Sequence, residues 1–95
     1  MTKYELQDLF EKHNDEYIMF RLVEPKRSRR ADLHGFILLD ELVPGDRDIL
    51  AGADLDEVYL SIDVDALAAV ITEAQVIELV RCGVQYNENG LCMFA

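Results

Sequence analysis

The final quarter of the chain predicts an α-helix that leads directly into a β-hairpin. Thr72 and Gln75 have the spacing of a capping box, so a helix is expected to follow, with a buried stripe of Val76, Ile77, Leu79 and Val80. Gly83 is typical of the residue that ends a helix. Two apolar runs then flank the segment Asn87-Glu88-Asn89-Gly90, and Asn-Gly is the strongest short signal for a hairpin turn. A helix joined to an antiparallel pair of strands favours an α+β fold.

Similar local signals predict two more helices and a strand. Thr2 and Glu5 form another capping-box pair, which predicts a helix over residues 3–12. Residues 63–70 predict a short helix, because the first of them is an aspartate, a typical N-cap. Apolar and polar residues alternate over Glu57–Ile62, which predicts a strand whose core-facing residues are Val58, Leu60 and Ile62.

Between these elements the pattern changes. Tyr17–Val23 is rich in aromatic and β-branched residues, so we expect a strand there. Asp32 is expected to cap a helix over residues 33–43, with a strand at 36–39 as the alternative. Residues 45–56 have the glycine and aspartate content of a loop.

Together these elements predict a single α+β domain, with about three helices packed on a small, mainly antiparallel sheet that includes a C-terminal hairpin. The 95 residues, 51% hydrophobic and 29% charged, suit one globular domain. No apolar run approaches the roughly 20 residues that span a bilayer, and the first residues lack the apolar stretch of a secretory signal. We therefore expect a cytoplasmic protein with no membrane partner.

The residues that could support catalysis or metal binding are few. Two cysteines, Cys82 and Cys92, are expected to be small buried thiols, with a bridge between them as the alternative. No paired-cysteine spacing indicates zinc, and the aspartate pairs lack the loop pattern of a calcium site. A cysteine paired in space with His13 or His34 is the remaining catalytic arrangement to consider. We expect no enzyme activity, no metal and no cofactor.

Charge is distributed unevenly along the chain. There are 19 acidic and nine basic residues, for a net charge of −10, and four of the basic residues lie in one pentapeptide. A strongly negative protein repels nucleic acid and anionic lipid and favours a basic partner surface. The pentapeptide could bind phosphates or an acidic surface, or it could simply be solvated; its basic residues are Lys26, Arg27, Arg29 and Arg30.

Seven acidic residues are concentrated in residues 40–57, where we expect the partner to bind. If they share one face, that face would resemble a nucleic-acid backbone to a basic groove. The expected partner-binding residues are Asp40, Glu41, Asp46, Asp48, Asp54, Asp56 and Glu57.

Three segments of the C-terminal half resemble small phage accessory proteins of unassigned role; they are Asp54–Leu60, Arg81–Val84 and Leu91–Ala95. In size and acidity the chain is also similar to anti-CRISPR and other anti-defence inhibitors. This resemblance implies stoichiometric binding to a host protein, a location in the host cytoplasm and no chemistry. Such inhibitors share no common motif, so the resemblance assigns no functional residue.

These observations predict a non-enzymatic inhibitor that docks on a basic surface of a nucleic-acid-handling protein, such as a CRISPR effector. The alternative is a self-associating structural or regulatory module. In that case Leu91–Phe94 would be an edge strand that pairs with a second copy to form a homo-oligomer.

Overall fold

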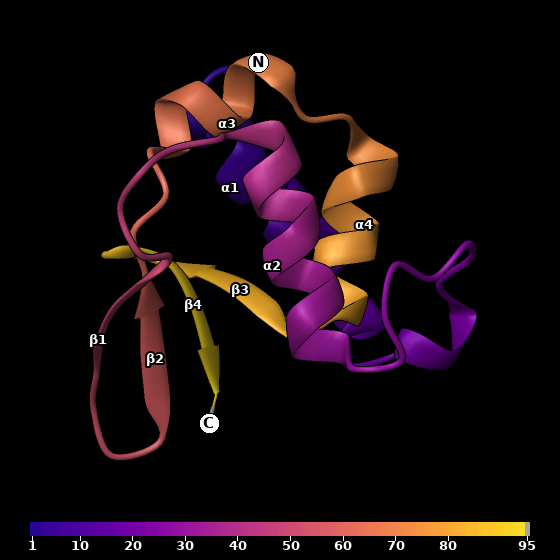
Figure 1. The fold of residues 1–95 in the computed structure, drawn as a ribbon. Coiled ribbons are helices and arrows are strands. Elements are labelled where there is room, and N and C mark those ends of the chain that lie inside the picture. The colour runs from indigo at the N-terminus through magenta and orange to yellow at the C-terminus, as the bar shows by residue number, and fades with distance from the viewer. Residues whose placement is uncertain (95) are drawn as a thin grey trace.

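The computed structural model describes residues 1–94, which fold into four α-helices and a four-stranded antiparallel sheet (Figure 1). The sheet has the order β1-β2-β4-β3, and the helices gather on one side of it. The α+β class is confirmed, with one helix more than the approximate three expected. The elements are α1 (Lys3–Lys12), α2 (Ala31–Leu42), β1 (Leu50–Ala53), β2 (Glu57–Leu60), α3 (Val64–Val70), α4 (Glu73–Arg81), β3 (Val84–Asn87) and β4 (Gly90–Phe94).

Three helices begin where their capping residues predict. In α1 the Glu5 N–H donates to Thr2 Oγ1 at 3.2 Å, and the Thr2 N–H donates to the Glu5 carboxylate at 3.0 Å. The same reciprocal pair opens α4, and an aspartate side chain caps α3. The prediction for α2 was wrong in one respect, because Arg30 is its N-cap residue and Asp32 lies inside the first turn. The alternative strand at 36–39 is also wrong, since α2 includes those residues.

The core lies between the helices and the inner face of the sheet. Each helix contributes a buried stripe, and the three strands β2, β3 and β4 contribute inward-pointing residues. Within residues 1–94, no helix has the length and apolar character needed to cross a bilayer. The fully buried large side chains are Leu6, Leu38, Leu39, Leu67, Leu79, Leu91, His34, Val76 and Val84.

The strand predicted for residues 17–23 is absent, and that prediction was wrong. The segment forms tight turns and a short 3₁₀ helix, η2 (Phe20–Leu22). Ile18 has a φ of +54°, which no strand residue adopts, and its N–H donates to the Val80 carbonyl of α4 at 3.2 Å. The aromatic and aliphatic residues therefore pack individually against other elements and form no ladder.

A strand appears where the sequence predicts a loop. Residues 50–53 form β1, which pairs with β2 although all four of its residues are exposed. Because β1 buries neither face, it needs no alternating pattern, and Leu-Ala-Gly-Ala shows none. Figure 1 shows the turn between β1 and β2 at the end of the sheet farthest from the helices.

The C-terminal hairpin forms as predicted, but its position rules out the edge through which self-association was expected. Gly90 has a φ of +108° and pairs with Asn87, so the turn depends on the residue that tolerates a left-handed backbone. β4 lies between β2 and β3, with both of its edges paired. Self-association through an edge at Leu91–Phe94 is therefore wrong; the free edges of the described sheet belong to β1 and β3.

Gly83, which ends α4, should be the glycine whose replacement reveals backbone strain. Its φ is +94°, and a Cβ there would meet ordinary contacts at 3.8 Å, so the cost is conformational. We expect Gly83→Ala to lower the free energy of unfolding by about 1–2 kcal/mol in urea titrations. Gly45→Ala, with open space around it, is the control and should leave stability within about 0.5 kcal/mol. Equal effects of the two substitutions would contradict this account.

Candidate functional site

The seven acidic residues expected to bind a partner follow one continuous stretch of chain from the end of α2 to the start of β2. Asp40 and Glu41 lie in the last turn of α2. The next pair is in the loop that leads to the sheet, and the last three are at the β1–β2 turn and the first residue of β2. In Figure 1 this stretch passes from the α3 end of the molecule to the far tip of the β1–β2 hairpin.

Two of the seven acids are engaged within the protein. The Glu41 carboxylate accepts a hydrogen bond from Arg27 Nε at 3.0 Å and forms an ion pair with Nη2 of the same guanidinium, and Glu57 accepts a hydrogen bond from the Asn87 amide at 2.8 Å. The other five are exposed, and in the part of the chain that the structure describes none of them forms an ion pair. We call these five the acidic edge: Asp40, Asp46, Asp48, Asp54 and Asp56.

An exposed leucine lies between the last two aspartates of the acidic edge. Leu55 lies between Asp54 and Asp56 at the hairpin tip and is 100% exposed. The turn is ordered by its own hydrogen bonds, from the Asp54 N–H to the Glu57 carbonyl at 2.7 Å and from the Leu55 N–H to Asp54 Oδ1 at 2.8 Å. An apolar side chain flanked by two carboxylates is therefore presented on a closed hairpin turn.

At its other end the acidic edge borders an open hollow of about 150 Å³. Asp40, Asp46 and Asp63 line it together with Arg47, whose charge offsets part of theirs. Across residues 1–94, no three acidic, histidine or cysteine side chains converge in a way that could hold a metal ion. The hollow is thus a polar depression beside the acidic edge.

The four basic residues of the pentapeptide divide into two pairs. Lys26 Nζ donates to the Val23 carbonyl at 2.8 Å and lies 5.1 Å from the centre of the Phe20 ring, so this lysine stabilises its own loop. Arg27 is bound to carboxylates, and Glu41 raises the pKa of its guanidinium by hydrogen bonding. Arg29 and Arg30 are exposed. The expected basic patch is therefore two outward-facing arginines on a loop that the other two residues anchor.

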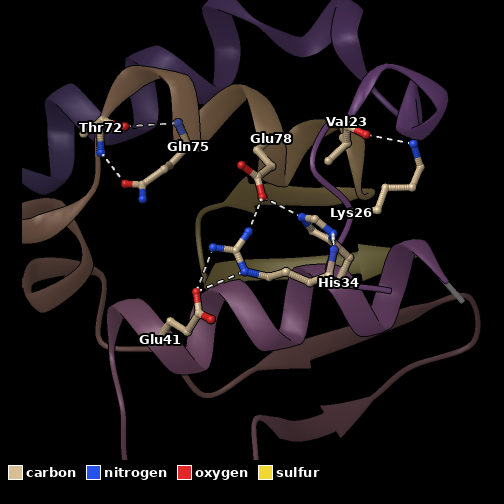
Figure 2. A network of polar contacts seen from close by, with 8 residues as sticks. Val23, Lys26, His34, Glu41, Thr72, Gln75 and Glu78 are labelled. Carbon is tan, nitrogen blue, oxygen red and sulfur yellow. Dashed lines mark hydrogen bonds and ion pairs between the residues drawn. The ribbon is translucent and has the colours of Figure 1, made fainter. Parts of the chain in front are cut away.

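His34 is the buried centre of a polar network that links this loop to α2 and α4 (Figure 2). Its Nδ1 accepts the Arg27 backbone N–H at 3.1 Å, so that nitrogen carries no proton. The proton of the neutral ring is consequently on Nε2, which donates to Glu78 Oε2 at 2.5 Å. Glu78 also accepts from the Arg27 guanidinium at 3.1 Å. One carboxylate of α4 thus binds both α2 and the loop before it, at residues 44 and 51 positions away in sequence.

This network occupies the groups that a cysteine–histidine pair would need. Both ring nitrogens of His34 already have partners, and His13 Nε2 is 2.6 Å from the Glu73 carboxylate. Cys82 and Cys92 are free and buried, so the alternative disulfide does not form. Burial raises the pKa of each thiol to about 12, with a further contribution from Glu78 at Cys82 and from Glu57 at Cys92. These thiols stay protonated at neutral pH.

Thiol labelling should separate folded from unfolded protein. At pH 8 a thiol with a pKa of about 12 is roughly one part in ten thousand thiolate, so iodoacetamide should leave both cysteines unmodified in the native protein and modify both in urea. A Leu55→Cys variant provides the control, because its exposed third thiol should react in the native state. Rapid native labelling of Cys82 or Cys92 would contradict the burial described here.

The same thiols make stability depend on pH in the alkaline range. An unfolded thiol ionises near pH 9 and the folded ones near pH 12, so the stabilisation from burying neutral thiols is complete below pH 9 and is lost between pH 9 and 12. We expect Cys82→Ala to flatten the decline of the unfolding free energy over this interval, as measured in urea at several pH values. An unchanged slope would contradict the assignment.

The carboxylate of Glu78 should contribute mainly as a hydrogen-bond acceptor for buried His34. Glu78→Ala leaves Nε2–H without a partner and should lower the unfolding free energy by about 1.5–3 kcal/mol in urea titrations. Glu78→Gln retains an acceptor oxygen and should lose about half as much. The control is Glu88→Ala at an exposed hairpin turn, expected within about 0.5 kcal/mol of the parent. Equal losses for the alanine and glutamine variants would contradict the acceptor role.

A groove between α1 and β3 is a second candidate site, and sequence reasoning missed it. Its volume is about 400 Å³. No single motif marks it, because its residues come from α1, the turn after α1, α4 and β3. The one signal in the sequence was the polar face of the predicted helix over residues 3–12. The apolar floor contains Phe10, Tyr17, Val80, Val84 and Tyr86, and the polar rim contains Gln7, Glu11, Asn14 and Gln85.

Comparisons with known proteins identified no relative of this chain. A scan against protein-family models found no match, and neither the curated proteins nor the solved structures contain a significant match. The assignment of function therefore depends on the two surfaces described above, the acidic edge with its exposed leucine and the groove beside β3.

Proposed function

We propose that the chain is a non-enzymatic protein-binding module that docks on a basic surface of another protein through the β1–β2 hairpin and the acidic edge. The observation that supports this most directly is the hairpin tip, where fully exposed Leu55 lies between Asp54 and Asp56. An isolated exposed leucine needs no explanation, but one held at the end of a projecting hairpin has the geometry of an anchor residue.

The two kinds of side chain contribute differently to such an interface. Burial of the leucine in a partner pocket would contribute about 1.5–3 kcal/mol, because apolar surface leaves water. The surrounding carboxylates would mainly accelerate encounter with a positive surface and reject negative ones. The net charge of −10 acts in the same direction at longer range. Specificity would thus come from the leucine and its pocket, and association rate from the acids.

The most specific form of this proposal is an inhibitor that occupies the nucleic-acid groove of a host protein, such as a CRISPR effector. Its support is electrostatic, because the acidic edge presents carboxylates to the lysines and arginines that would otherwise bind phosphates. Binding of the protein itself to nucleic acid is disfavoured by the same charge.

The electrostatic part is tested by binding measurements against purified nucleic-acid-binding proteins with basic clefts, CRISPR effectors among them. For a partner that binds, affinity should fall at least about tenfold between 50 and 200 mM salt, and excess duplex DNA should compete. Binding that is insensitive to salt and unaffected by DNA would exclude an acidic edge in a nucleic-acid groove.

Matched variants identify the surface. The double variant Asp54→Lys and Asp56→Lys should weaken binding at least about tenfold through slower association, and Leu55→Ala should weaken it at least about tenfold through faster dissociation. The control is Asp8→Lys with Glu88→Lys, which changes the net charge equally at exposed positions outside the acidic edge. If the control weakens binding as much as the hairpin variant, net charge alone is responsible and the proposed surface is wrong.

Self-association remains the second candidate function, because β1 has a free edge and four exposed residues. Light scattering separates the two candidates. A concentration-independent dimer that Ala51→Pro abolishes would favour self-association through β1. A monomer at the concentrations used for partner binding would favour the docking module.

A further inference from the structure

The groove between α1 and β3 runs beside the free edge of a strand. Three consecutive residues of β3, Val84 to Tyr86, line it, although successive residues of a strand point to opposite faces. A cavity that contacts all three must therefore lie beside the strand, where alternate N–H and C=O groups point away from β4. In the described sheet no other strand pairs with this edge.

The groove is longer than its largest hollow. A second hollow of about 320 Å³ adjoins the first, and Gln7 and Tyr86 line both. The second hollow reaches Asn87, the last residue of β3. The combined groove thus follows the whole four-residue strand, about 13 Å of extended chain.

The chemistry of the groove suits a peptide backbone. Its floor is apolar, with Phe10 and Tyr86 packed at a ring-centre distance of 5.9 Å. Its rim has three carboxamide side chains, from Gln7, Asn14 and Gln85, and amides donate to and accept from peptide groups. None of these three has a side-chain hydrogen bond elsewhere in residues 1–94.

The charge at one end of the groove is negative. Glu11 lines the groove and has no cation partner in the described part of the chain. Lys12, the next residue, is already bound to Glu73, and Arg81, which follows the groove-lining Val80, is bound to Glu16. A ligand with a lysine or arginine near this end would therefore meet an uncompensated carboxylate.

We infer that this groove binds an extended, basic peptide segment of a partner protein, which pairs with β3 as a fifth strand of the sheet. Backbone hydrogen bonds to the edge of β3 would supply affinity, and alternate side chains would fill the apolar floor. Glu11 would select a basic residue at the Val84 end. The site is separate from the acidic edge, because β1 and β3 are at opposite ends of the strand order.

A second copy of this chain fits the groove less well than a basic peptide. Pairing of two β3 strands would bring together two molecules that each carry a net charge of −10, and it would set the two Glu11 side chains beside the same short interface. A foreign segment of opposite charge meets neither obstacle.

The test uses ¹⁵N-labelled full-length protein and two capped hexapeptides of alternating valine and threonine. One peptide has a lysine at its N-terminal position and the other has a lysine at its C-terminal position. Binding should shift the amide resonances of residues 84–87 and of the groove-lining part of α1 at peptide concentrations up to about 1 mM. Methylation of alternate peptide nitrogens gives two further probes. Because a strand pairs through one edge, one methylated peptide should lose at least tenfold in affinity and the other should bind almost as well as the parent.

Variants of exposed α1 residues test the site with little risk to folding. Gln7→Trp fills the groove and should abolish the shifts, whereas Asp8→Trp, on the same helix but outside the groove, should retain them. Glu11→Lys should weaken the lysine peptide at least tenfold, and Asp8→Lys should change its affinity less than threefold.

Three outcomes would overturn the inference. The first is an absence of shifts for every peptide at 1 mM. The second is equal binding of both methylated peptides, which would mean that side chains alone fill the groove. The third is a dimer by light scattering that Gln7→Trp dissociates, which would assign the groove to a second copy of the chain.

Discussion

The Glu78 carboxylate holds together parts of the molecule that are far apart in sequence. It accepts one hydrogen bond from buried His34 of α2 and another from Arg27 of the basic loop, and Arg27 in turn binds Glu41 near the far end of α2. α2 therefore sits against α4 with its polar groups satisfied, and the loop before it is anchored. The Arg27 backbone N–H occupies Nδ1 of His34, so the ring proton is on Nε2. Without the Glu78 carboxylate this buried Nε2–H would have no acceptor.

This arrangement determines which charges remain for function. Arg27, Lys26, Glu41 and Glu57 are bound within the protein, so their contribution to a partner surface is small. Of the seven expected acids and the four basic residues of the pentapeptide, those left outward are the five of the acidic edge and the two arginines Arg29 and Arg30. The helices gather on one side of the sheet and the β1–β2 hairpin projects away from them (Figure 1), while β3, an end strand, borders the groove. Both proposed surfaces are consequences of a small sheet whose end strands lack neighbours.

Most local signals in the sequence were reliable, with the expected Asp32 cap as the exception, whereas the strand predicted from the apolar run at residues 17–23 was wrong. The capping residues of α1, α3 and α4 and the Gly90 turn were predicted correctly, because each depends on partners two to four residues away. Residues 17–23 have strand-like composition, but a hydrogen bond to α4 and a left-handed Ile18 make them turns. β1 was missed for the opposite reason, since it pairs with β2 without burying a face. Of the candidate site, the sequence identified the acidic residues but neither the exposed leucine between them nor the groove.

The sequence by itself determined where most helices begin and end, where the chain reverses at the last hairpin, and that the surface is strongly negative, because these properties depend on neighbouring residues or on a sum over all residues. Only the tertiary structure decided the strand order, which put β4 in the interior and left β1 and β3 as edges. It also decided which acids are free, that both cysteines are buried, and which tautomer His34 adopts. Those properties depend on groups brought together from distant positions, and no local pattern encodes such contacts.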